Sequence, residues 1–208
     1  MKDKITLKNS WELLTYSDFE QLVQIGEANI PDHYRTTHIL SVLTGEDVEY
    51  IEDLPVTVFM KLAGQLAFLN DKPKATPHKN EYEVNGRKYI LKAEVDKICT
   101  AQFLDYGNYI KEENPSTVKL ASCFLIPEGH TYGDGYDINQ VLSDIRCMTF
   151  QDVNSIAFFL QTQYAAYMLI SIDSMERQMK KMKIPKKKRQ ESLIPLRSMV
   201  RSLLSSNS

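Results

Sequence analysis

The chain has 208 residues, of which 43% are apolar and 25% are charged, and its net charge is −2. This length suits one domain with at most an extension, and the apolar fraction is enough for a hydrophobic core. The three cysteines, Cys99, Cys123 and Cys147, form no C-x-x-C pair. This spacing argues against a zinc ribbon or a dithiol redox site and favours reduced thiols in a cytosolic setting. The N-terminus, MKDKITLKNS, has no apolar core, so we expect no secretion signal.

The charge is unevenly distributed along the chain. Residues 1–176 carry 15 basic and 26 acidic side chains, a net −11, whereas residues 177–208 carry 10 basic and 1 acidic, a net +9. We therefore predict an acidic, mainly helical globular domain over residues 1–176 and a basic C-terminal extension over residues 177–208.

The first elements are a short strand and a helix. Ile5 and Leu7 alternate with polar residues, which allows a short N-terminal strand. Ser17 and Glu20 have the spacing of a capping box, which predicts a helix over residues 18–26.

Three further helices follow. Asp32 is suited to cap a helix over residues 34–43, and the stretch TGEDVEYIEDLP indicates one short helix. Pro55 fits the first turn of another helix that runs to about Leu69.

Residues 70–80, which contain two prolines and several lysines, have the composition of a linker. Asn85-Gly86 then lies between two runs of alternating apolar residues, which predicts a β-hairpin over residues 81–92 with a type I′ turn. The side chains expected to share one face are Tyr82, Val84, Tyr89 and Leu91.

The pattern returns to helix after the hairpin. Thr100 can cap a helix over residues 101–113, and Asn114-Pro115 opens another that continues to Phe124.

The last part of the chain contains the longest predicted helix. Asp137 caps a short helix before it, Thr149 opens the long helix, and the long helix runs toward Met182 and breaks before Pro185. A final amphipathic piece covers residues 193–204.

The longest apolar stretch, residues 156–172, has Gln161, Thr162 and Gln163 at its middle. A membrane span needs about 20 mostly apolar residues without polar residues at its middle. We therefore interpret this stretch as a buried helix and predict no membrane contact. Together the patterns predict a mainly α-helical α+β fold with one β-hairpin around Asn85-Gly86.

The stretch HTYGDGYD, residues 130–137, combines a histidine with two aspartates and two glycines and could indicate a metal loop. Its acids miss the positions of a calcium-binding EF-hand loop, and neither glycine leads into lysine as in a phosphate-binding loop. We interpret the stretch as a glycine-assisted turn before a helix capped by Asp137. The chain also lacks G-x-S-x-G, G-x-G-x-x-G and H-E-x-x-H. We therefore predict no enzyme activity, catalytic residue, metal site or cofactor.

Two features near the C-terminus are candidates for interaction. Lys186, Lys187, Lys188 and Arg189 follow Pro185 and resemble a nuclear import signal or a phosphate-binding patch. A solvated tail, or contact with an acidic protein such as the acidic body of another copy, is the alternative. Because residues 177–208 contain no aromatic side chain, solvent or protein contact is favoured over nucleic acid.

The second feature is a methionine stripe. Met175, Met179 and Met182 recur at the i, i+4, i+7 spacing of one helix face. Core packing is the ordinary explanation, and an adaptable binding surface is the other, because methionine side chains repack around varied partners.

The order of these segments resembles small proteins of tailed bacteriophages and related prophages of gut Bacteroidales, including crAss-like phages. The nearest functional class is the tail assembly chaperones. The resemblance covers roughly residues 5–170 and rests on six segments: ITLKNSWELLTYSDFEQLVQI, HILSVLTGEDVEYIEDLP, FLNDKP, EVNGRKYIL, ASCFLIPEGHTYGDGYD and AFFL.

The resemblance implies a non-enzymatic protein that binds a tail or other structural protein of the virion, with homo-oligomers as a further expectation. It implies a location in the host bacterial cytoplasm during assembly, or in the virion itself. Two alternatives stay open. One is a structural component of the neck or tail, such as a connector or ring subunit. The other is a nucleic-acid-binding protein that acts through the basic tail.

Overall fold

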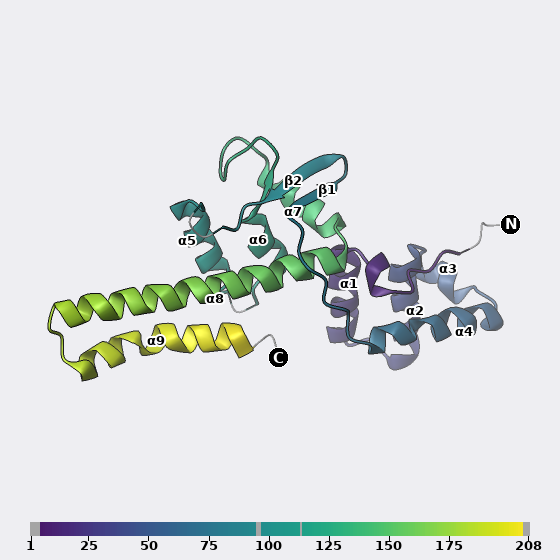
Figure 1. Cartoon of the computed structure of the whole chain (residues 1–208). Coiled ribbons are helices and arrows are strands. Elements are labelled where there is room, and N and C mark those ends of the chain that lie inside the picture. Colours follow the sequence, from purple (N-terminus) through teal and green to yellow (C-terminus); the bar gives the residue numbers. More distant parts are fainter. Residues whose placement is uncertain (1–4, 95–96, 113, 206–208) are drawn as a thin grey trace.

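The computed structural model describes residues 5–94, 97–112 and 114–205 (Figure 1). Its helices are α1 (Tyr16–Glu27), α2 (Asp32–Thr44), α3 (Val48–Glu52), α4 (Val56–Gly64), α5 (Thr100–Tyr109), α6 (Thr117–Ser122), α7 (Ile138–Cys147), α8 (Phe150–Lys181) and α9 (Lys186–Ser205). Its 3-10 turns are η1 (Trp11–Leu13) and η2 (Gln65–Asn70), and its strands are β1 (Glu81–Val84), β2 (Arg87–Leu91) and β3 (Leu125–Pro127). The predicted mainly α-helical α+β class is confirmed.

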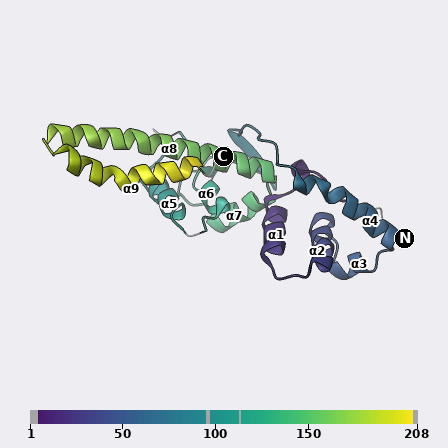
Figure 2. The same cartoon turned by 90° about the horizontal axis from the view of Figure 1, so that it is seen from below.

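The molecule is elongated along α8. Helices α1 to α4 gather at one end, and the sheet with α5, α6 and α7 lies along the N-terminal part of α8 (Figure 1). Helix α9 folds back along the C-terminal part of α8, so the turn between them forms the end of the molecule farthest from α2, α3 and α4 (Figure 2). The boundary predicted at residue 176 falls inside α8, because residues 177–181 continue that helix.

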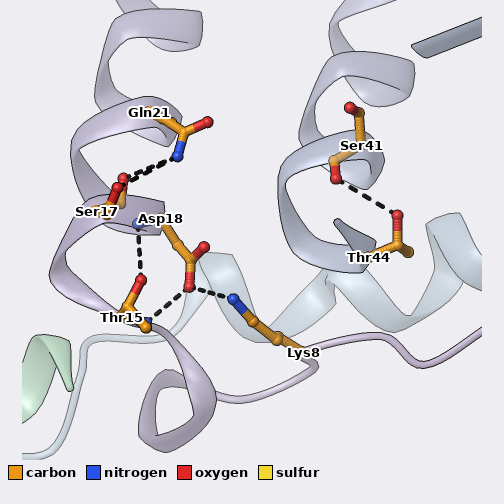
Figure 3. A network of polar contacts seen from close by, with 7 residues as sticks. All are labelled: Lys8, Thr15, Ser17, Asp18, Gln21, Ser41 and Thr44. Atoms are coloured by element: carbon orange, nitrogen blue, oxygen red, sulfur yellow. Dashed lines mark hydrogen bonds and ion pairs between the residues drawn. The ribbon is translucent and has the colours of Figure 1, made fainter. Parts of the chain in front are cut away.

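The capping of α1 differs from the prediction. Thr15, not Ser17, is the N-cap: its hydroxyl accepts from Asp18 N at 3.1 Å, and the Asp18 carboxylate accepts from Thr15 N at 2.7 Å (Figure 3). Lys8 Nζ lies 2.6 Å from the same carboxylate, which is largely buried. Asp18 therefore completes a capping box two residues earlier in the chain, and the Ser17 hydroxyl instead accepts from Gln21 Nε2 at 3.5 Å.

The predicted strand at Ile5 and Leu7 is wrong, because residues 5–9 belong to no strand. Lys8 N donates to Leu43 O at 3.0 Å. Leu43 lies in the last turn of α2, where carbonyls lack a partner inside the helix. The backbone of this segment therefore donates a hydrogen bond to a carbonyl at the C-terminal end of α2 instead of pairing with a strand.

The hairpin prediction is confirmed. Strands β1 and β2 pair antiparallel with Val84 opposite Arg87, and Asn85 and Gly86 adopt the left-handed φ values of 52° and 72° that a type I′ turn requires. The side chains expected on one face are all buried: Tyr82, Val84, Tyr89 and Leu91.

The third strand, β3, was not predicted. Its residues were assigned to the region where the helix that ends at Phe124 stops. Helix α6 ends at Ser122, and Leu125–Pro127 pairs antiparallel with β2. Leu125 and Ile126 are both fully buried. A short apolar run that is buried on both faces has no period that separates a strand from a helix. The caps predicted at Asn114 and Thr100 also shift by one or two positions, to Ser116 and Cys99.

Helix α8 carries the core. Its N-terminal half buries Val153, Ile156 and Leu160 against the rest of the domain. Residues 156–172 lie within α8, but this stretch is only partly buried, because Phe158, Leu169 and Ile170 are exposed. Helix α8 is also long and apolar enough to cross a membrane. The core helix of a folded domain meets the same criteria of length and composition.

The C-terminal half of α8 forms a helical hairpin with α9, named here the α8–α9 hairpin. Met168, Ile172 and Met175 on α8 recur at the spacing of a coiled-coil seam, as do Leu193, Leu196 and Val200 on α9. Ile172, Leu193 and Val200 are almost fully buried. Pro195 lies inside α9 and removes one backbone hydrogen bond from that helix.

Candidate interaction site at the tip of the helical hairpin

The lysine-rich turn (residues 180–189) joins α8 to α9 and has a defined backbone. Lys183 N donates to Lys180 O and Ile184 N donates to Met179 O, both at 3.0 Å. Lys183 has a φ of 57°. These two bonds and the left-handed residue form a Schellman motif, in which glycine usually takes the place of Lys183.

The turn concentrates positive charge. Residues 180–189 contain seven Lys and Arg side chains and no acid. Among the described residues, Lys180 has an ion-pair partner, Glu176 at 3.4 Å, and the remaining lysines of the turn have none. All of these lysines are exposed. Like charges held this close repel one another, and the repulsion is relieved when an anionic partner binds.

The four residues singled out from the sequence lie on the first turn of α9. Lys186, Lys187 and Lys188 are exposed there. Cations are unfavourable at a helix N-terminus, because the helix dipole is positive at that end. Lysines in this position therefore cost folding free energy, and an anionic partner would recover it.

Arg189 differs from its three neighbours because it is half-buried. Its Nε and Nη1 atoms are buried and have no hydrogen-bond partner among the described residues. The structure therefore divides the predicted patch into three outward lysines and one inward arginine.

The methionine stripe is divided in the same way. Met175 and Met179 are half-buried, and Met175 packs against the core. Met182 is 65% exposed and lies in the lysine-rich turn. Met182 is therefore the member of the stripe that a partner could reach, and it lies among the lysines.

Glu176 fixes the hairpin below the turn. Its carboxylate lies 3.1 Å from Arg197 Nη2 of α9 and 3.4 Å from Lys180 Nζ of α8. This acid therefore links the two helices one turn before the cationic tip.

The HTYGDGYD stretch is a turn, as the sequence indicated. Gly133 and Gly135 have φ values of 76° and 71°, and Asp137 caps α7 by accepting from Asn139 N at 2.9 Å. Tyr132 donates to Asp105 of α5 at 2.6 Å. The polar residues of this loop therefore hold the loop and its neighbouring helix in place.

Asp144 of α7 is the centre of a polar network that was not predicted from the sequence. It is 0% exposed and accepts hydrogen bonds from Tyr89 Oη at 2.6 Å, Asn85 Nδ2 at 2.8 Å, Arg87 Nη1 at 2.9 Å and Gln140 Nε2 at 3.1 Å. Burial raises the pKa of this carboxyl, but the combined hydrogen bonds outweigh burial, so its pKa is lowered. The network fastens the hairpin turn to α7. Its only sequence signal is one aspartate on the apolar face of a helix.

The potential metal ligands and the three thiols of the described residues are scattered through the fold. The described His, Cys, Asp and Glu side chains form no group of three or more that could hold a metal ion. Cys123 is buried, and burial raises the pKa of its thiol to about 12. Cys99 and Cys147 are exposed.

Comparison of the chain with protein families, curated proteins and solved structures finds no match.

Proposed function

We propose that the protein is a non-enzymatic assembly factor that binds an acidic protein surface through the lysine-rich turn. One observation carries this proposal. Lys186, Lys187 and Lys188 are exposed at a helix N-terminus, where the helix dipole disfavours cations, and the exposed apolar side chain of Met182 belongs to the same turn. Cations around an apolar anchor suit an acidic protein partner with an apolar centre.

The partner that we propose is a structural protein of a phage virion, such as a tail or tape-measure protein. This part of the proposal rests on the resemblance of residues 5–170 to tail assembly chaperones. The place of action is then the cytoplasm of the infected bacterium. The position of the turn at the far end of the hairpin supports such a role, because a partner can approach it without contacting the core (Figure 2).

A second candidate function, nucleic-acid binding, is favoured by the same exposed lysines. A phosphate backbone needs only cations, so the absence of aromatic side chains in residues 177–208 weakens this candidate without removing it. The two functions differ in the contribution of Met182. A phosphate backbone gains little from an apolar side chain, whereas a protein surface buries it.

The test uses the full chain as bait in a lysate of infected cells, with purified particles analysed beside it by mass spectrometry. The variant reverses three charges: Lys186→Glu, Lys187→Glu and Lys188→Glu. We expect the wild-type chain to enrich a virion structural protein, and the variant to lose at least about tenfold of that enrichment. Met182→Ala should lower the enrichment too, and it should leave retention on DNA unchanged.

The matched control reverses three exposed lysines far from the turn: Lys72→Glu, Lys74→Glu and Lys111→Glu. It should capture the partner as well as the wild type. Equal loss in both triple variants would contradict a specific role of the turn. A stoichiometric amount of the protein in finished particles would instead favour a structural component of the virion. Retention on DNA that falls steeply with salt and requires Lys186, Lys187 and Lys188 would favour the nucleic-acid candidate.

A further inference from the structure

The N-terminal end of the molecule contains an apolar groove of about 410 Å³. Helices α2, α3 and α4 form its walls, which include Thr37, Ile51, Leu54, Val56 and Phe59. Val56, which lines the groove, is 76% exposed, and Met60, one turn further along α4 and outside the groove lining, is 63% exposed. Large apolar side chains exposed in and beside a groove indicate a surface that another protein covers.

The rim of this groove is acidic. Glu52 lines the groove itself, and Asp47, Glu49 and Asp53 lie on the same short helix or at its ends. These four acids are exposed. Residues 27–60 contain seven Asp and Glu side chains against a single arginine, a net −6. The groove therefore suits a basic ligand that carries an apolar group.

The lysine-rich turn has this chemistry. Residues 180–189 carry a net +7, and Met182 is exposed among those cations. Ile184 lies two residues further along the turn and is half-buried. The net charges of the two surfaces are therefore opposite in sign and similar in size. Each surface also exposes apolar atoms beside its charges.

The turn and the groove of one chain cannot meet. They lie at opposite ends of the molecule in both views (Figure 1, Figure 2). Helix α8, which lies between them, has 32 residues and is therefore about 48 Å long. Any contact between these two surfaces must join different copies.

We propose that the lysine-rich turn of one copy docks into the acidic groove of a second copy. Met182 enters the apolar groove, and the exposed lysines of the turn face Glu49, Glu52 and Asp53 on its rim. The contact joins two different surfaces, so a bound pair still presents a free groove on one copy and a free turn on the other. Repetition produces head-to-tail chains, or a ring if the rotation between copies closes. This inference rests on the proposed role of the turn and names a second copy as one partner that it binds.

The test measures the mass of the full chain in solution by light scattering, at about 50 mM and about 500 mM salt. We expect masses above the monomer that rise with protein concentration at low salt and fall at high salt. The turn variant (Lys186→Glu, Lys187→Glu, Lys188→Glu) and a groove variant (Glu49→Lys, Glu52→Lys, Asp53→Lys) should each remain monomeric. The variant with Lys72→Glu, Lys74→Glu and Lys111→Glu is the control and should associate like the wild type.

Mixing the two blocked variants identifies the geometry. The turn variant keeps an acidic groove and the groove variant keeps a basic turn, so an equal mixture should form a 1:1 complex and grow no further. A chain that carries both sets of reversals should stay monomeric, because the reversals leave a net charge of +1 on residues 180–189 and 0 on residues 27–60. A monomeric wild type at low salt, or an equal mixture that stays monomeric, would overturn the proposal.

The same variants separate this inference from the proposed function. If the groove variant still captures the virion protein while the wild type does not self-associate, self-docking is wrong and the assembly function stands. If self-association follows the predicted pattern but the turn variant captures the virion protein as well as the wild type, the turn binds other copies and the proposed partner is wrong.

Discussion

Thr15 and Thr149 pair with each other in an antiparallel bridge, and each of them also caps the helix that follows it. Tyr16 N donates to Met148 O at 2.9 Å, and Phe150 N donates to Leu14 O at 2.8 Å. The N-termini of α1 and α8 are therefore held together by backbone bonds. Side-chain caps on both helices satisfy further backbone N–H groups at the same place.

Thr149→Ala should lower the free energy of unfolding by about 1 kcal/mol, because the Thr149 hydroxyl accepts from Asp152 N at 3.1 Å. Thr149→Ser keeps this hydroxyl and should lose much less. Urea unfolding followed by circular dichroism measures both. Equal losses in the two variants would mean that the methyl group matters rather than the cap.

Asp144→Ala should be among the most destabilising single changes in the chain, at about 3 kcal/mol. It leaves the buried Tyr89 hydroxyl without its acceptor and removes the ion-pair partner of the exposed Arg87 guanidinium. Asp173→Ala, an exposed position on α8, is the control and should change stability by less than about 0.5 kcal/mol. Urea unfolding of the two variants beside the wild type checks this, and similar midpoints would contradict it.

The contribution of Asp144 should depend on pH. Its pKa is lower in the folded protein than in the unfolded chain, where an aspartate titrates near about 3.9. The stabilisation is therefore fully present above the unfolded pKa and is lost as pH falls through the folded pKa. The stability difference between wild type and Asp144→Asn should stay constant from about pH 7 to about pH 5 and shrink below about pH 4. A difference that grows on acidification would reverse the assigned direction.

Lys183→Gly should stabilise the α8–α9 hairpin by up to about 1 kcal/mol, because Lys183 has a positive φ that glycine adopts without steric cost. Lys181→Gly removes the same charge from the last turn of α8 and should destabilise by a similar amount. Hydrogen exchange in α9 reports both effects. If the two variants shift in the same direction, charge rather than backbone conformation controls this turn.

The three thiols should react differently with a thiol reagent. Cys99 and Cys147 are exposed, whereas Cys123 is buried and its pKa is raised to about 12 by burial. Two thiols per chain should therefore react quickly in the native protein, and the third only after denaturation. Fast reaction of all three at neutral pH would mean that the packing around Cys123 opens readily.

The elements that follow from local chemistry could be predicted from the sequence. Asn85-Gly86 requires a type I′ turn, Asp137 and Thr149 are side-chain caps, and the long apolar pattern after Thr149 continues as one helix. Each of these features depends on residues a few positions apart.

What could not be predicted depends on contacts between distant segments. The choice of Thr15 over Ser17 as the cap is reinforced by Lys8, which pairs with Asp18. Strand β3 exists because β2 offers it an edge. Asp144 gains its partners only when the hairpin packs on α7.

The sequence identified the residues of the candidate site but not their positions in the structure. The lysines were identified from the charge of residues 177–208, and the methionines from their spacing on one helix face. Which of them are exposed depends on where α9 lies: Arg189 turns inward, and Met182 stays outside. The groove between α2, α3 and α4 has no local signature, because its walls come from three separate helices.

Helix α8 also has a mechanical consequence. It is a single unbroken helix from the bridge at Thr149 to the lysine-rich turn, and it contains no proline or glycine at which it could bend. A force applied to the lysine-rich turn is therefore transmitted along α8 to the bridge between Thr15 and Thr149 at its N-terminal end.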